Sequence, residues 1–383
     1  MTAVFAIAGV AGAFRLIHFA QASSQDFQVY WNAVRAWLAG RPPYAYNPQD
    51  LGFVFKYPPW MLPLFAPFGF IPWEASKTIW ILAQIAIIGY SVRWLIRNRV
   101  QWQVAIGTAF LFWWIWLAHA SAGQFTMALL FTALWAFPFE SPNRTSVLAL
   151  IFSSKIFSLI TLGGLWRQYL RPRVWLSIVG FLLVAHAIIF ALSPHETFLS
   201  LYSGWFRAAT SGGAELGAEV VRGQGNHGFT AGILRWSGVD SRSFNWDIGT
   251  SLVLGVLFGG IWTRFSRLLS SAERWAGWLA LGVIVHPLAW HHSFVLAFPL
   301  CAFAWDRAIK TGDRRLIATG FFGIAFIGLL IPQTIGHEWV RPLELVSVKS
   351  WGVVLSSLTL VLARMRVRTE PEKQFDAKVE HIT

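Results

Sequence analysis

Long apolar segments recur along almost the whole chain, and they limit its possible folds more than any other feature. In lipid, only helices and closed barrels satisfy every backbone hydrogen-bonding group, and uninterrupted apolar runs of this length are typical of helices. The charge content agrees, since 13% of the residues are charged, against about 25% in a soluble domain. The sequence therefore predicts an all-α polytopic membrane protein. Its apolar segments are residues 3–20, 75–92, 102–118, 125–139, 146–166, 174–192, 247–263, 275–289, 291–305, 316–331 and 346–363.

Basic residues indicate how these segments are oriented. Clusters of arginine and lysine lie in short connections, whereas the connections 119–124 and 286–290 contain neither residue. Cytoplasmic loops of membrane proteins carry the excess of Lys and Arg, so the clusters predict which segment ends face the cytoplasm. The net charge of +13 is then explained by topology, and nucleic-acid binding is rejected. The clusters lie at 93–101, 167–173, 264–274, 306–315 and 364–368.

The apolar run 146–166 conflicts with a simple crossing. At about 1.5 Å per residue it spans roughly 31 Å, which would place Arg144 and the cluster 167–173 on opposite sides of the membrane. Lys155 lies near its centre, where a charge costs about 2.5–3.5 kcal/mol. We therefore expect two half-length helices that meet at Lys155 on the external side. This hairpin brings the number of transmembrane segments to about twelve, with both termini inside.

Two long loops, 21–74 and 193–246, then face outward, and long loops over a helical scaffold are where function concentrates. The first contains the proline-broken stretch 56–72, which predicts short helices at the interface rather than a span. We interpret residues 1–363 as one membrane domain and 364–383 as a cytoplasmic tail. Cysteine is present only once, so the chain has no internal disulfide.

The positions of the acidic residues reduce the number of function classes that fit the chain. None of the 18 Asp and Glu residues falls in the middle of a predicted span, whereas proton-driven transporters keep ionisable groups at the bilayer midplane. The sequence also has no Asp-x-Asp pair for holding a metal-bound nucleotide. These features disfavour a transporter and a nucleotide-sugar enzyme, and we expect neither a metal nor another cofactor.

Asp26 opens the first external loop, six residues beyond the first apolar segment. Asp26 and Tyr30 are four residues apart and share a face if the stretch is helical. A carboxylate at the membrane surface, close to hydrogen-bonding groups, is suited to act as a general base. The alternative is a capping role, since Ser23, Ser24 and Asp26 all suit the N-terminus of a helix over 27–38.

Two adjacent histidines, His291 and His292, lie at the external start of a segment. Imidazole there is suited to relay a proton, bind a phosphate oxygen or ligate a metal. Adjacent histidines point to different faces of a helix, however, and are a poor metal pair by themselves. Lys155 shares this external side in the predicted topology and suits a lipid phosphate. Its alternative role is simple snorkelling to the interface.

Several short motifs together give a resemblance. They are Asp26-x-x-x-Tyr30, Pro43-Tyr44, Tyr57-Pro58-Pro59, Gly123-Gln124, Lys155 and Pro287-x-x-Trp290-His291-His292. In this order the chain resembles glycosyltransferase family 87, a group of enzymes that depend on polyprenyl-phosphate-mannose and have the C-type membrane architecture. The resemblance covers roughly residues 20–300.

The resemblance implies roles for the matching residues. Asp26 is expected to be the catalytic base, with Lys155 and His291 or His292 on the donor phosphate. Tyr30, Tyr57, Gln124 and Asn226 are the candidate substrate-binding residues. One departure concerns the second long loop, where relatives often have an Asn-Gln-Ser type motif and this chain has Asn226-His227-Gly228. Acceptor identity is therefore left open.

The resulting hypothesis is an inverting membrane glycosyltransferase. It would transfer a hexose, with mannose implied by the resemblance, from a polyprenyl-phosphate donor to a glycolipid or glycan acceptor. The active site would face outward from the cell (inner) membrane. Two alternatives remain: a flippase or transporter of lipid-linked sugars, and an enzyme of the O-antigen ligase or polymerase type. Arginines in the loop 193–246 keep the second alternative open, because such enzymes favour arginine-rich external loops.

Overall fold

The computed structural model describes residues 24–45, 53–155, 159–192, 198–215, 225–238 and 244–369. Every named element in these ranges is a helix, and the one β-bridge joins Asn226 to Trp290. The first half contains α2 (Gln25–Leu38), η2 (Pro59–Met61), α3 (Leu62–Gly69), α4 (Trp73–Arg97), α5 (Trp102–Leu111), α6 (Trp113–Ala122), α7 (Thr126–Ala136), α8 (Pro142–Ser153), α9 (Leu159–Leu162), η4 (Gly163–Leu165), α10 (Trp166–Tyr169) and α11 (Pro172–Leu192). The second half contains α12 (Phe198–Glu215), α14 (Phe229–Ser237), α15 (Phe244–Phe265), η5 (Ser266–Leu268), α16 (Ser271–Ile284), η6 (His291–Ala297), α17 (Phe298–Thr311), α18 (Arg314–Gly328), α19 (Pro332–Ile335), α20 (His337–Leu345) and α21 (Val348–Thr369).

Four helices in the described ranges are long and apolar enough to cross a membrane: Trp73–Arg97, Pro172–Leu192, Trp246–Leu268 and Val348–Val367. The pair α5 and α6, bent by 56°, makes a fifth if it counts as one span. The all-helical architecture is thus as predicted, but about twelve spans are not confirmed. Several predicted segments are interrupted: 275–289 ends its helix at Ile284, and 291–305 begins as the 3₁₀ helix η6. The first segment, 3–20, lies outside the described residues.

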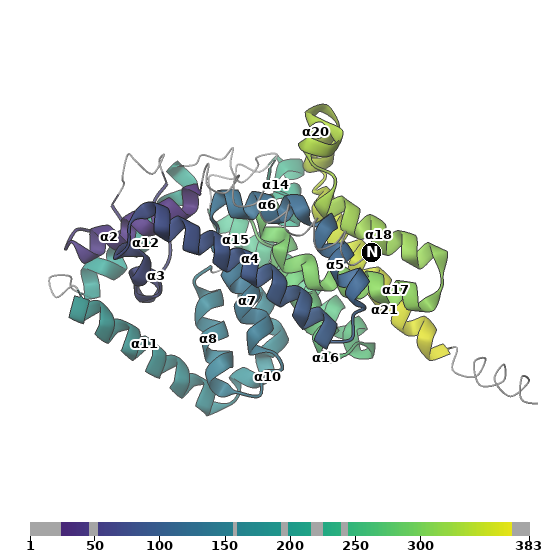
Figure 1. Cartoon of the computed structure of the whole chain (residues 1–383), viewed down its shortest axis with the longest axis horizontal. Coiled ribbons are helices and arrows are strands. Elements are labelled where there is room, and N and C mark those ends of the chain that lie inside the picture. Colours follow the sequence, from purple (N-terminus) through teal and green to yellow (C-terminus); the bar gives the residue numbers. More distant parts are fainter. Residues whose placement is uncertain are drawn as a thin grey trace, which may run out of the picture.

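The helices form an elongated bundle (Figure 1). One end of its long axis carries α2, α3 and α12, and the other carries α17, α18 and α21, while α20 projects from the upper edge of the view. The α18–α21 contact is close because a glycine from each helix meets the other backbone. A Cβ added at Gly352 would lie 2.6 Å from the carbonyl oxygen of Gly323. Small residues of this kind let membrane helices approach closely.

Four of the five basic clusters meet on one side of the bundle. Glu273 accepts from Arg307 and Arg364, each at 2.7 Å. Asp306 accepts from Lys310 at 2.6 Å and from the backbone N–H of Gln101 at 2.8 Å. The connections 93–101, 264–274 and 306–315 and the start of the tail therefore lie together, as expected if all of them face the same compartment.

The predicted hairpin at Lys155 agrees with the chain path. α8 ends at Ser153, two residues before Lys155, and the chain returns through α9, η4 and α10. Ser146, near the start of α8, donates its hydroxyl to the Val174 carbonyl at 2.8 Å, so both feet of the hairpin lie at the same end. Lys155 lies at the opposite end, beside the α6–α7 junction.

Parts of the two long predicted loops are helical. The loop 21–74 contains α2, η2 and α3, which include the helix expected at 27–38 and the short helices expected at 56–72. The loop 193–246 contains α12 and α14. Residues 46–52 and most of the chain between α12 and α14 lie outside the described ranges, as does the tail from residue 370. The division into one membrane domain and a tail stays a proposal.

Candidate active site

The first turn of α2 is anchored against the end of α6. The backbone N–H of Ser24 donates to the Ser121 carbonyl at 2.7 Å. Gly123 closes α6 with a φ of 70°, and a Cβ there would lie 2.8 Å from Cβ of Phe27. Glycine is needed because this position combines a left-handed backbone with contact to α2. Ser24 occupies the N-cap position without a side-chain cap bond. Asp26 therefore lies inside the first turn, and the capping role considered for it is wrong.

A hydrogen-bonded chain links Asp26 to Lys155 through one side-chain amide. The amide nitrogen of Gln124 donates to Oδ2 of Asp26. Lys155 Nζ donates to the amide oxygen of Gln124 at 3.2 Å and to Oγ1 of Thr126 at 3.1 Å. Both ends of the Gln124 amide are thus used, which fixes its orientation. A carboxylate and an ammonium group are held at either end of a single side chain.

Burial sets the basicity of Asp26. Removal of the carboxyl from water raises its pKa from 3.8 to about 6, while Lys155, the Gln124 hydrogen bond and Lys56 act in the opposite direction. Burial wins because a charged carboxylate loses more hydration than these groups return. A half-buried carboxylate with this pKa is a stronger base than an exposed one. It is still ionised in most molecules at neutral pH.

Two tyrosines, Tyr30 and Tyr57, lie close to Asp26. The hydroxyl oxygens of Tyr30 and Tyr57 are 3.2 Å apart, and Asp26 lies within electrostatic range of both. Burial raises the pKa of each phenol, so both remain neutral and keep a proton to donate. Tyr44 fixes the second of them by donating to the Tyr57 carbonyl at 3.0 Å.

His292 borders this network, together with a histidine that the sequence did not single out. The ring centroids of His292 and His119 are 6.1 Å apart, and the charge of Lys155 acts on both rings. His119 Nε2 accepts from the backbone N–H of Met127 at 3.1 Å. Its Nδ1 therefore carries the proton and donates to Oε1 of Gln84 at 3.0 Å. The only signal for His119 in the sequence is a polar residue ending an apolar segment.

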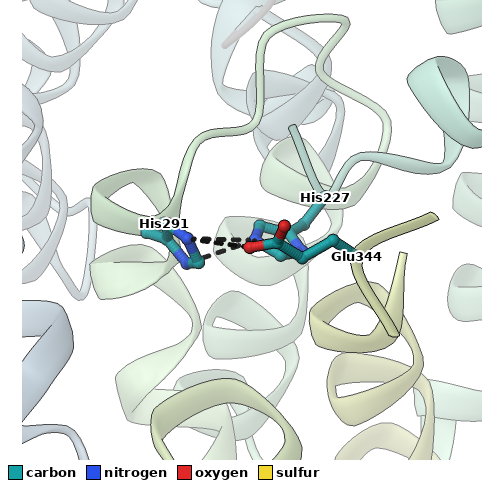
Figure 2. A group of neighbouring side chains, drawn as sticks. All are labelled: His227, His291 and Glu344. Carbon is teal, nitrogen blue, oxygen red and sulfur yellow. Dashed lines mark hydrogen bonds and ion pairs between the residues drawn. The ribbon is translucent and has the colours of Figure 1, made fainter. Parts of the chain in front are cut away.

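His291 belongs to a different group, although it is the next residue along. His291 lies beside His227 and Glu344 (Figure 2), with 3.5 Å between its Nε2 and Oε1 of Glu344. Glu344 belongs to α20, more than fifty residues along the chain, and nothing in the sequence pattern pointed to it. The resemblance implied that His291 or His292 reaches the donor phosphate. Of the two, His292 is the one that lies on the Lys155 side.

Asn226 has a positioning role in the fold. Its Oδ1 accepts from the backbone N–H of Ala289 at 3.0 Å, and its Nδ2 donates to the Pro287 carbonyl. These bonds hold the connection from α16 to η6 against the start of α14. The side chain is fully buried, so Asn226 orients the residues that precede His291 and His292. The structure brings together Asp26, Tyr30, Tyr57, Gln124 and Lys155 from the candidate set.

Comparison with known proteins gives this arrangement its context. The model of glycosyltransferase family 87 matches residues 55–287, which include Tyr57, Gln124 and Lys155. A polyprenol-phosphate-mannose-dependent alpha-(1-2)-phosphatidylinositol mannoside mannosyltransferase of Mycobacterium tuberculosis is 26% identical over 387 residues, covering 89% of this chain and 86% of the relative. No solved structure matches the chain. The matched family model covers more than half of the chain, and this protein, with its apolar spanning helices, belongs to glycosyltransferase family 87 and is a membrane glycosyltransferase.

Proposed function

We propose that this enzyme transfers a hexose, mannose, from a polyprenyl-phosphate donor to a glycolipid or glycan acceptor with inversion at the anomeric carbon. The name of the mycobacterial relative supports a polyprenol-phosphate-mannose donor and a glycolipid acceptor. The observation that carries the proposal is the single amide of Gln124, which joins Asp26 to Lys155. A base for the acceptor and a cation for the leaving phosphate are the two groups that this reaction needs.

In the proposed reaction, Asp26 takes the proton of the acceptor hydroxyl. The acceptor oxygen forms a bond to the anomeric carbon on the face opposite the phosphate. The bond between that carbon and the phosphate oxygen breaks, and its electron pair leaves with the polyprenyl phosphate. A positioned base contributes about 10²–10⁴-fold to such a rate.

Lys155 and His292 are proposed to hold the donor phosphate. Negative charge grows on this phosphate as the glycosidic bond breaks, and a fixed cation in a half-buried site stabilises that charge. The ammonium group of Lys155 has three donors, and Gln124 and Thr126 take up two of them. Tyr30 and Tyr57 are proposed to contact the sugar, because both pack against the Phe65 ring and both lie within electrostatic range of the Asp26 carboxylate.

We further propose that this site faces outward from the inner membrane. Four of the basic clusters lie together around Glu273 and Asp306, whereas Lys155 lies at the far end of its hairpin from the Ser146–Val174 contact. The positive-inside rule assigns the basic side to the cytoplasm. The end that holds Lys155 and Asp26 is then external, where a lipid-linked donor enters laterally between helices.

The test is transfer by purified protein from polyprenyl-phosphate-mannose to a membrane glycolipid extract, read as product mass. We expect Asp26→Asn to lower turnover by at least about a hundredfold with unchanged expression. Glu74→Gln is the matched control, since Glu74 is an exposed carboxylate at the start of α4 and should retain normal turnover. Near-normal turnover of Asp26→Asn would remove Asp26 from the role. Use of a diphosphate-linked donor would favour the ligase alternative, and absence of any product would favour the flippase.

A further inference from the structure

Three side chains from separate parts of the chain converge beside the candidate active site. His227 precedes α14, His291 begins η6, and Glu344 lies in the last turn of α20. Figure 2 shows the three groups pointing toward one another. One ligand atom from each lies within 4.8 Å of the others. All three residues lie on the external side in the proposed topology.

The spacing of these atoms suits a tetrahedral metal. His227 Nε2 lies 3.4 Å from His291 Nε2. Oε1 of Glu344 lies 3.5 Å from the Nε2 atom of His291 and 4.0 Å from that of His227. Zinc with ligands at about 2.0–2.2 Å in tetrahedral geometry places those ligands about 3.3–3.6 Å apart. Two of the three separations already agree, and a small shift of Glu344 brings in the third.

Hydrogen bonding alone accounts poorly for the arrangement. His227 Nε2 is 3.1 Å from Nδ1 of His291 and 3.4 Å from its Nε2, so it faces the edge between the two nitrogens rather than one lone pair. A hydrogen bond weakens steeply away from its lone-pair direction. His227 is also fully buried, and its Nδ1 has no hydrogen-bond partner within the described ranges. A buried imidazole with such poor partners is costly unless something else binds it.

From these observations we propose that His227, His291 and Glu344 bind one divalent transition-metal ion, for which zinc is the best fit. Two imidazoles and a carboxylate are typical zinc ligands and leave one coordination position for water. Solvent reaches the group, because the side chains of His291 and Glu344 are 27% and 11% exposed, so an ion has a path to it. The site goes beyond the transfer reaction, which the proposed mechanism completes without a metal.

Two cationic side chains lie beside the three proposed ligands and lower their affinity for a metal ion. Arg235 donates to the backbone carbonyls of Asn226 and Glu344 at 2.9 and 3.1 Å, and Lys349 donates to the Ile327 carbonyl at 2.5 Å. Both lie within electrostatic range of the ligands. Their charges repel a divalent ion, so binding is weaker than at a site with no neighbouring cations. Their hydrogen bonds to carbonyls also hold the surrounding backbone in place.

A metal here would act on the active site through the chain. His291 is bonded to His292, so an ion on His291 would tie the start of η6 to α14 and α20 and fix where His292 points. The role is structural positioning. The adjacent pair His291–His292 looked like a poor metal pair in sequence, and it is one, because only His291 turns toward the other ligands.

The experiment is a metal-content measurement on the full chain in detergent, purified with a tag that contains no histidine. Protein is loaded with zinc chloride, passed through a desalting column and analysed by elemental mass spectrometry. We expect about one zinc per chain, falling at least about tenfold in His227→Asn and in Glu344→Gln, since loss of one of three ligands removes most of the affinity. His337→Asn and Glu338→Gln are the matched controls, because both residues are exposed in the same helix α20, and they should keep the zinc.

Two further readouts separate ligand loss from misfolding. Cobalt should give the strong visible absorption of a tetrahedral site in the parent and the controls only. Zinc should raise the Tm of the parent and the controls, but not that of His227→Asn or Glu344→Gln. Equal zinc content in the parent and in the two ligand variants would overturn the proposal, as would a parent that holds no zinc. Neither result depends on the sugar donor, so the transfer hypothesis stands or falls separately.

Discussion

The protonation state of Asp26 should control both the activity and the stability of the enzyme. Burial raises the pKa of its carboxyl from 3.8 to about 6. At about 1.4 kcal/mol per pH unit, this difference corresponds to about 3 kcal/mol of cost for keeping the ionised form in the folded protein at neutral pH. Solvent reaches the half-buried carboxyl and screens part of this cost, so we expect about 1–3 kcal/mol.

Proton linkage gives the direction in which stability changes with pH. Between pH 4 and 6 the folded protein binds more protons at Asp26 than the unfolded chain does, so the free energy of unfolding falls as pH rises through this window. Below it both states are protonated, and above it the full cost is present. Asp26→Asn removes the charge and keeps the shape. It should therefore raise Tm at pH 7.5 by about three times as much as at pH 4.5, where only part of the cost is present.

Activity should follow the same group in the opposite sense. The kcat/KM of the parent enzyme should fall about tenfold per pH unit below pH 6, because only the ionised carboxylate accepts the acceptor proton. The assays are transfer rates from pH 4.5 to 8 and thermal unfolding in one detergent at pH 4.5 and 7.5. An acid limb near pH 4 would refute the reasoning, as would a lower Tm for Asp26→Asn than for the parent at pH 7.5.

Two further substitutions test the framework around the site. Gly123→Ala should lower stability by about 1–2 kcal/mol for the left-handed alanine alone, and by more because the new Cβ would lie 2.8 Å from Cβ of Phe27. Thermal unfolding measures this loss, and an unchanged Tm would contradict the contact. Glu273→Gln should cost about 1.5–3 kcal/mol, because the buried carboxylate loses its charged hydrogen bonds to the partly exposed Arg307 and Arg364. The exposed pair of Glu74 with Lys77 predicts less than about 1 kcal/mol for Glu74→Gln. Equal losses in these two variants would show that the cluster around Glu273 is not buried.

The sequence predicted those features that depend on local chemistry. A helix over 27–38 follows from its flanking residues and is found as α2. The hairpin at Lys155 follows from the cost of a charge at mid-membrane and the position of the next basic cluster. The family was reached through short motifs, including Tyr57 and Gln124, and the family model confirms it. Each of these inferences requires only the identity of neighbouring residues, or the side of the membrane on which a loop lies.

The sequence could not show where helices break or which distant residues meet. The length of an apolar run does not show whether it forms one continuous helix. The segment 291–305 divides into η6 and α17, with Pro299 in the first turn of α17. This is one reason why counting runs predicted about twelve spans and the structure has four or five in its described part. The meeting of His227 with Glu344 depends on how α14 and α20 pack, which no spacing along the chain encodes.

The shared amide of Gln124 has a consequence for the order in which substrates act. The Gln124 amide holds Lys155 near Asp26, and the positive charge of Lys155 keeps the carboxylate less basic than its burial alone would make it. A phosphate that arrives at Lys155 neutralises that influence, and proton affinity at Asp26 then rises. In the proposed reaction Asp26 becomes a stronger base only after the donor has bound. The enzyme without donor is therefore a weaker catalyst for deprotonating water or an alcohol that is not the acceptor.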